Sequence, residues 1–255
     1  MLESLSSALA EISLLQLVLI AAMALVASVL GGVAGYGTGA LMPLVLVPIV
    51  GAEPVVPILS ISALLTNTSR TAAFWTFVDG KRALIVLVAA VPTCMLGAWG
   101  YTMLSGKGAA LVIGAMLVAS VPLRRLMRRR GLALSSRGLA AACFGWGPLA
   151  GGTVGAGIIL PSLLMAAGLE GAAVVATDAV ISIGIGLAKL TTFGLAGAVN
   201  ATVIAIALLI GGVAFPGAFL AKRLIERLPL HVHTAILDAV VIVGGAVMIV
   251  NAFVR

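Results

Sequence analysis

The chain has 255 residues, of which 62% are hydrophobic and only 9% are charged. Soluble domains carry about 25% charged residues, so this composition, with a mean hydropathy of +1.26, excludes a soluble protein. The net charge of +7 resembles that of a nucleic-acid binder, but six arginines of the chain are gathered in one hydrophilic stretch. We therefore expect an integral membrane protein whose surroundings are the lipid bilayer.

Ten apolar segments follow one another along the chain. In order they are 13–35, 39–50, 54–77, 83–104, 107–123, 138–155, 157–168, 171–196, 199–221 and 231–253. A membrane span takes about 20 residues, so segments 39–50 and 157–168 are too short to cross alone. The pattern predicts an all-α polytopic membrane protein with five segments in each half.

The two short segments open with the same motif. Gly-x-Gly-x-x-x-Pro occurs at 37–43 and again at 155–161. Downstream of each copy one cation interrupts an apolar run, Arg70 in the first half and Lys189 in the second. Two like halves, each broken by Gly and Pro, are typical of secondary transporters. We predict two inverted repeats, each with a short broken helix.

Charge predicts how the halves are oriented. The first transmembrane repeat, the basic cytoplasmic linker and the second repeat are expected at 1–123, 124–137 and 138–255. The arginines that place the linker in the cytoplasm are Arg124, Arg125, Arg128, Arg129, Arg130 and Arg137. Because each half has an odd number of segments, Glu53 should lie outside and Glu170 inside. A nucleic-acid or protein partner for the arginines is the alternative that the sequence leaves open.

Segment 54–77 has one polar stripe. Ser60, Asn67, Arg70 and Thr71 fall within roughly a quarter of the circumference of a helix. An arginine at the bilayer centre costs at least about 2.5 kcal/mol, so the stripe should face protein or water. Arginine suits an anion with several oxygens, which it can bind in a bidentate manner. The alternative is that Arg70 snorkels to the cytoplasmic surface.

The matching segment 171–196 has a second stripe. Asp178, Ser182 and Lys189 share one helix face, with Asp178 and Lys189 about 16 Å apart along a continuous helix. The two cannot pair unless the helix breaks, for which Gly184 and Gly186 are candidates.

Asp178 is the candidate for proton coupling, because an intramembrane carboxylate can alternate between charged and neutral forms. Pairing with a basic residue of another segment is the alternative, and Asp238 in the last segment is the competing coupling site.

The Gly-rich breaks precede short helices, whose backbone N–H groups and positive ends attract anions. The residues concerned include Gly37, Gly39, Gly155 and Gly157; close helix packing is the alternative reading. No Ser/His/Asp arrangement, paired carboxylates or phosphate-binding loop is visible, so an enzyme is not expected. His231 and His233 point to different sides of a helix, and we predict neither a metal nor a cofactor.

The chain resembles the sulfite exporter TauE/SafE family of membrane transporters. The resemblance rests on the Gly-rich first segment leading to Gly-x-Gly-x-x-x-Pro, the second copy after a basic linker, and the Lys- or Arg-bearing helices that follow each short segment. It implies a polytopic inner-membrane protein that moves sulfite, organosulfonates or other small anions.

The predicted function is therefore a secondary transporter that exports a small anion by alternating access, driven by the proton gradient. A passive anion channel and a membrane scaffold or assembly factor are the alternatives. The residues predicted to bind the anion are Arg70, Lys189, Asn67, Thr71, Gly37, Gly39, Gly155 and Gly157.

Overall fold

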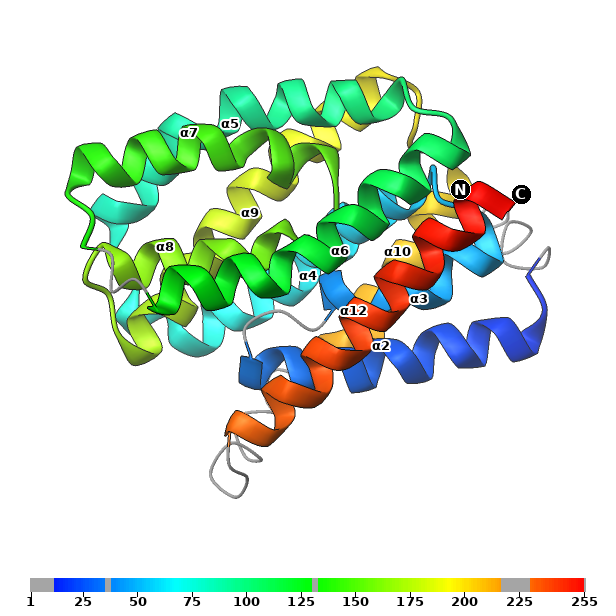
Figure 1. Cartoon of the computed structure of the whole chain (residues 1–255), viewed down its shortest axis with the longest axis horizontal. Helices are drawn as coiled ribbons and strands as arrows, with labels where there is room; N and C mark the ends of the chain where they lie inside the picture. The colour runs from blue at the N-terminus through cyan, green and yellow to red at the C-terminus, as the bar shows by residue number, and fades with distance from the viewer. Residues whose placement is uncertain (1–11, 35–37, 130–132, 217–229, 255) are drawn as a thin grey trace.

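The computed structural model describes residues 12–34, 38–129, 133–216 and 230–254. This part of the chain is almost wholly helical and contains no strand, as the sequence predicts (Figure 1). The helices are α2 (Leu14–Ala34), α3 (Thr38–Val50), α4 (Val55–Phe74), α5 (Gly80–Thr102), α6 (Gly106–Arg129), α7 (Ser136–Gly152), α8 (Ile159–Ala166), α9 (Gly171–Leu195), α10 (Ala201–Ala214) and α12 (Leu230–Val254). Two 3-10 turns precede α5 and α8, namely η1 (Trp75–Phe77) and η2 (Ala156–Ile158).

Three helix starts follow from capping side chains. Asp79 before α5, Ser135 before α7 and Asn200 before α10 each accept a hydrogen bond from the backbone N–H three residues further on. These bonds satisfy N–H groups that the first helical turn leaves without partners. The polar residues between apolar segments therefore fix where the helices begin.

The two predicted short segments are short helices. α3 has 13 residues and α8 has 8, about 20 Å and 12 Å of helix against a hydrocarbon core of about 30 Å. Before α8 the chain turns at Gly155, whose φ of +86° lies in the left-handed region that favours glycine. The first predicted break falls on residues 35–37, so the prediction for Gly37 lies outside the described residues.

The central helices of the two halves run antiparallel. Arg70, near the end of α4, bonds to Asp178, near the start of α9. At the other end of the pair, Gly186 of α9 lies beside Ser60 of α4. α6 and α12 are also antiparallel, since Arg124 bonds to Asp238 while Gly114 packs on Gly245.

The remaining contacts exchange helices between the halves. α5 packs on α7 and α9 of the second half, and α10 packs on α2 and α4 of the first half. In the predicted repeat, α5 is equivalent to α10, α7 to α2 and α9 to α4. The contacts of α5 therefore correspond to those of α10, as a duplicated fold would produce. Figure 1 shows α5 and α7 lying side by side away from α2 and α12. The inverted orientation of the halves agrees with these contacts and stays a prediction.

The helix formed by the fifth predicted segment continues beyond its apolar residues. α6 continues through Arg129, so the first six residues of the predicted linker are helical. Arginine is a good helix former, and Asp238 of α12 bonds Arg124 at 2.5 Å and Arg125 at 3.0 Å. The charges of Arg124 and Arg125 are therefore partly neutralised by Asp238.

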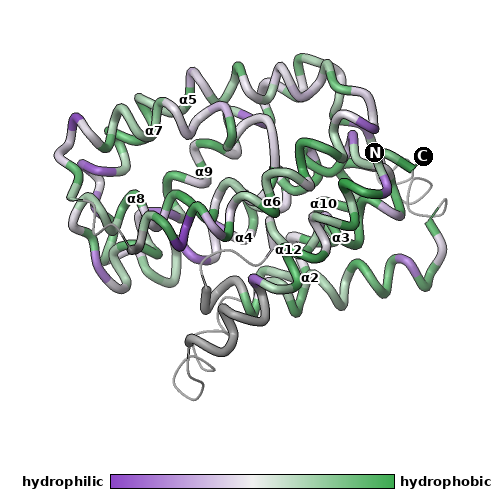
Figure 2. The backbone as a smooth tube through the Cα atoms, viewed as in Figure 1, coloured by the Kyte–Doolittle hydropathy of each residue, from purple (hydrophilic) through white to green (hydrophobic). Residues whose placement is uncertain are grey.

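Three helices are long and apolar enough to cross a membrane, by length and composition, among the described residues. They are Gly80–Thr102, Gly106–Met127 and Gly171–Leu195. Large apolar side chains also lie on the outer surface, as Leu84, Val88 and Leu96 do on one side of α5. Figure 2 shows that hydrophobic residues predominate along α2 and α3 as well. An apolar exterior of this kind fits a lipid environment.

Glycines set the close approach of α5 and α7. A Cβ added to Gly147 would overlap the side chain of Thr93, and one added to Gly151 would overlap the carbonyl of Cys94. Small residues allow helix backbones to touch in membranes, where apolar side chains gain little from leaving lipid. The glycines of α7 therefore hold α5 against the second half.

We expect Gly151→Ala to destabilise the protein by roughly 1–3 kcal/mol, because the added methyl group meets rigid backbone. Gly145→Ala, on the same helix but with open space at its Cβ, is the matched control and should not destabilise. Thermal unfolding of the purified variants in detergent checks both. Equal melting temperatures for Gly151→Ala and the wild type would contradict the packing argument.

The inverted topology predicts labelling from opposite sides. Glu53 and Glu170 are both exposed at helix starts. With the buried Cys94 and Cys143 replaced by alanine, Glu53→Cys should react with an impermeant thiol reagent from outside and Glu170→Cys from inside. The measurement is mass-tag labelling of intact cells and inside-out vesicles. Reaction of both positions from the same side would exclude the inversion.

Candidate anion-binding site

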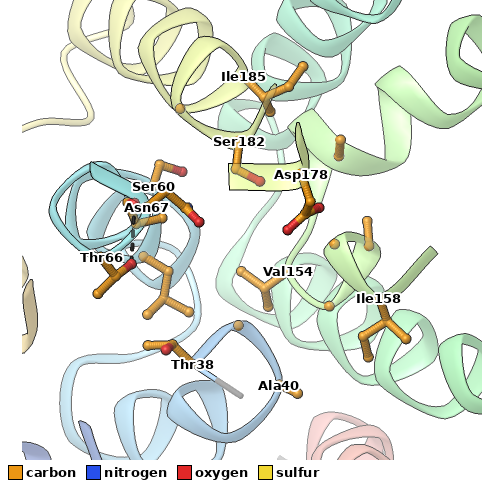
Figure 3. A pocket seen from close by; sticks show the side chains of 18 of the residues that line it. Thr38, Ala40, Ser60, Thr66, Asn67, Val154, Ile158, Asp178, Ser182 and Ile185 are labelled. Atoms are coloured by element: carbon orange, nitrogen blue, oxygen red, sulfur yellow. Dashed lines mark hydrogen bonds between the residues drawn. The ribbon is translucent and has the colours of Figure 1, made fainter. Parts of the chain in front are cut away.

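One cavity of about 190 Å³ lies where α3, α4, α9 and the break between α7 and α8 come together. Seven of the predicted site residues line it: Gly39, Asn67, Arg70, Gly155, Gly157, Asp178 and Lys189. Figure 3 shows Asp178 and Ser182 on one side of the cavity, Ser60 and Asn67 on another, and Thr38 below. Thr71 is not among the lining residues.

The two broken segments meet at this cavity. A Cβ built on Gly39, at the start of α3, would lie 3.9 Å from the backbone nitrogen of Gly155. The indole of Trp146 donates a 2.9 Å hydrogen bond to the carbonyl of Ala156 and so holds the turn that leads to α8. A Cβ on Gly157 would meet no atom within 4 Å. Copies of one motif, 118 residues apart in sequence, thus bring both helix starts to one place.

Arg70 is bonded across the halves to Asp178. Its Nη2 donates to Oδ2 of Asp178 at 2.9 Å, and its Nη1 donates to Oδ1 of Asn67 at 3.1 Å. The side chains of Arg70 and Asp178 are 15% and 4% exposed. The buried Nε of Arg70 has no hydrogen-bond partner among the described residues. This geometry fits an internal ion pair and does not fit an arginine that snorkels to the surface.

Lys189 is the second cation of the cavity, and it is only 8% exposed. Its Nζ donates a 3.0 Å hydrogen bond to the carbonyl of Ala150. Within the described part of the chain, no carboxylate oxygen lies within 4 Å of this ammonium. α9 is continuous from Gly171 to Leu195, so Asp178 cannot fold back to reach it. Lys189 thus carries a buried charge that Asp178 does not compensate directly.

The glycines of α9 pack against neighbours instead of breaking the helix. Gly184 lies against the side chain of Leu87 and Gly186 against that of Leu64. Their role in the described structure is therefore close packing and not a helix break, as is common for glycines in membrane helices.

Several residues that line the cavity were not identified by the sequence patterns. Hydroxyl side chains of Ser28, Thr66 and Thr153 line the cavity, as does Thr38. Thr38 lies inside the first motif copy and Thr153 two residues before the second, so a search of the residues beside the motif would have found both. Ser28 on α2 gives no comparable signal.

A polar cluster lies beside the Asp178 end of the cavity. The hydroxyl of Thr177 accepts a hydrogen bond from the backbone N–H of Asp79 at 3.0 Å. Asp79 pairs with Arg82, which also donates to the carbonyl of Ala167 at 2.7 and 3.0 Å. The backbone N–H of Arg82 holds the pKa of Asp79 below its usual value. The cluster connects the starts of α5 and α9 to the turn after α8.

Asp238, the competing candidate for coupling, does not line the cavity. It is buried between α12 and α6, where it accepts bonds from Arg124 and Arg125. Its position away from the cations of the cavity separates it from the anion site.

The fold is that of a helical membrane protein, and the cations Arg70 and Lys189 line its cavity beside the starts of α3 and α8, an arrangement typical of transporters for charged solutes. Residues 20–248 match the family model for the sulfite exporter TauE/SafE. The chain belongs to this family, whose members are transporters and not enzymes. No curated protein and no solved structure matched the chain.

The ion pair predicts a difference between a single and a double variant. Arg70→Gln should destabilise the protein by about 3–5 kcal/mol, because it leaves the Asp178 carboxylate buried and unpaired. Arg70→Gln combined with Asp178→Asn should recover most of that stability. Thermal unfolding in detergent measures both. If the single and double variants melt at the same temperature, the pair does not matter to the fold.

Proposed function

We propose that this chain is a secondary transporter that exports a small anion, sulfite or an organosulfonate, across the inner membrane by alternating access. Membership of an exporter family supports transport in general. The substrate class and the mechanism are argued below from the cavity.

The observation that carries the proposal is Lys189. A buried ammonium without a counter-charge costs several kcal/mol, and in membrane segments such groups mark substrate paths. An anion in the cavity would supply the missing charge and could accept hydrogen bonds from the ammonium and the neighbouring hydroxyl groups. A volume of about 190 Å³ favours a small solute over a nucleotide or a lipid.

The position of the cavity supports alternating access. It lies between helices of both predicted halves, and the irregular backbone before α8, at Gly155 and η2, lines it instead of facing lipid. Rocking of the surrounding helices around a fixed site would expose it to each side in turn. Asp178, bonded to Arg70 in this cavity, is the carboxylate that we propose to link transport to protons.

Two alternative functions predict a different anion flux. A passive anion channel would conduct far faster than a carrier and would not saturate with substrate. A scaffold or assembly factor would move no anion at all, and Lys189 would then be a structural residue. Flux measured in proteoliposomes separates these functions.

Lys189→Gln should lower the initial rate of sulfite or sulfonate efflux by about ten- to a hundredfold, because a hydrogen bond to a charged group is worth about 1.5–3 kcal/mol. Lys81→Gln removes an exposed lysine at the start of α5 and is the matched control. Efflux from loaded proteoliposomes, with equal reconstituted protein and protein-free liposomes as background, checks both.

The wild type and Lys81→Gln should saturate with substrate at similar rates. Equal flux through Lys189→Gln would overturn the assigned site, and no flux through the wild type with any of sulfite, sulfoacetate, sulfate or carboxylates would overturn the transport proposal.

A further inference from the structure

We propose that the cavity holds two anion subsites, one open at Lys189 and one at Arg70 that opens only when Asp178 takes up a proton. Substrates with two anionic groups then bind together with one proton, whereas substrates with one anionic group bind without a proton. The inference rests on the proposed function, because it concerns the anion that the cavity carries.

The charges of the cavity lead to this rule, that a proton binds together with a second anionic group. Among the described residues, its charged lining residues are two cations, Arg70 and Lys189, and one carboxylate, Asp178. The ion pair of Arg70 with Asp178 leaves one net positive charge, which a single anionic group at Lys189 neutralises. A second anionic group would make the site negative unless a proton from bulk water neutralises Asp178. In a low-dielectric cavity such an uncompensated charge is costly.

The hydrogen bonds of Arg70 show how the second subsite is blocked. Nη1 is bonded to Asn67 and Nη2 to Asp178, while Nε is buried without a partner among the described residues. A carboxylate or sulfonate group that binds in a bidentate manner needs two donors of the guanidinium. At Nε an anion has no protein partner to displace among the described residues, but at Nη2 it must replace Asp178. Protonation weakens the hold of Asp178 on Arg70 and makes that replacement possible.

The two subsites open toward each other. Helical side chains lean toward the N-terminus of their own helix, and α4 and α9 run antiparallel. Lys189 on α9 therefore leans toward the level of Asp178, and Arg70 on α4 leans toward the level of Lys189.

The duplication explains why only one cation has a carboxylate. Arg70 and Lys189 are 119 residues apart, and the same interval places Leu59 at the position equivalent to Asp178. Leu59 lines the same cavity but cannot form an ion pair. The first half thus lacks the carboxylate that would block Lys189 as Asp178 blocks Arg70.

Other titratable groups around α9 do not replace Asp178 in this role. The elements packed on α9 are α4, α5, α7, α8 and η1, and α8 and η1 contain no titratable side chain. α4 contributes Arg70 alone. The others on these elements, their caps and α9 itself are Asp79, Lys81, Arg82, Cys94, Tyr101, Arg137, Cys143, Glu170 and Lys189. Asp79 and Arg82 form a separate pair, and Glu170 is exposed at the start of α9.

The rule specifies the sense of proton coupling. A bis-anionic substrate and its proton move in the same direction, so an inward proton gradient opposes export of such a substrate. A monoanion leaves without a proton and is unaffected by that gradient. This sense differs from the expectation that the proton gradient drives export, which requires the proton to move against the anion.

A matched pair of anions tests the rule. Ethanesulfonate has one anionic group, and sulfoacetate has a carboxylate in place of its methyl group. From about pH 5.5 to about pH 7 both keep a fixed charge, since free carboxyl groups ionise near pH 4. Dissociation constants for the purified wild type should fall up to about tenfold per pH unit of acidification for sulfoacetate and stay constant for ethanesulfonate. Isothermal titration calorimetry in buffers of different ionisation enthalpy should show uptake of one proton with sulfoacetate only.

Variants that change the net charge of the cavity by one should change which anion binds together with a proton. Asp178→Asn leaves Arg70 without a carboxylate, so sulfoacetate should bind with no pH dependence. Lys189→Gln removes the open cation, so ethanesulfonate should bind more weakly and acquire the pH dependence. Asp79→Asn, outside the cavity and able to keep the helix cap, is the matched control and should behave as the wild type.

The outcomes separate the inference from the function on which it rests. Binding of neither anion to the wild type would refute the proposed anion site and the inference with it. Binding of both anions with equal pH dependence, or with none, would overturn the inference and leave anion transport standing. Retention of the sulfoacetate pH dependence by Asp178→Asn would also overturn it.

Discussion

The ion pair between Arg70 and Asp178 is the interaction on which the arrangement of the cavity depends. It joins α4 to α9, the central helices of the two halves, and the side chains of Arg70 and Asp178 are only 15% and 4% exposed. Each charge would be costly alone, so each requires the other to stay in place. The pair also decides how the cavity can be used, because it occupies a guanidinium that would otherwise bind an anion. Stability and the proposed proton coupling therefore depend on the same bond.

The two halves contribute unequally to the charge of the cavity. In the predicted repeat Arg70 and Lys189 occupy equivalent positions, but within the described part of the chain only Arg70 has a carboxylate beside it, since Leu59 stands where the first half would need one. A fully symmetric pair of ion pairs would leave the cavity neutral and give an anion no counter-charge. Without any carboxylate, two buried cations would repel each other across the cavity. The single Asp178 is the arrangement that leaves one positive charge for a ligand.

Much of the fold can be predicted from the sequence, because lipid constrains segment length and the duplicated motif marks both breaks. Both short helices, and the positions of Arg70 and Lys189 in the cavity lining, follow from aligning the two copies of the motif. The partner of Asp178 could not be predicted, since it lies 108 residues away in the other half. The continuation of α6 beyond residue 123 could not be predicted for a similar reason. Hydropathy carries no information that Asp238 on α12 neutralises the arginines of α6. Local patterns predict segments, whereas ion pairs between segments depend on packing.

The exchange of helices between halves limits how the cavity can open. Because α5 packs on α7 and α10 packs on α2, the sequence halves cannot separate as rigid bodies. The buried side chains form two hydrophobic clusters, one built mainly on α2, α3, α4, α6 and α10 and one on α7, α8, α9 and the first part of α5. The cavity has lining residues from both clusters. Under the proposed alternating access, these two clusters are the bodies that would rock, and the antiparallel contact of α4 with α9 lies between them.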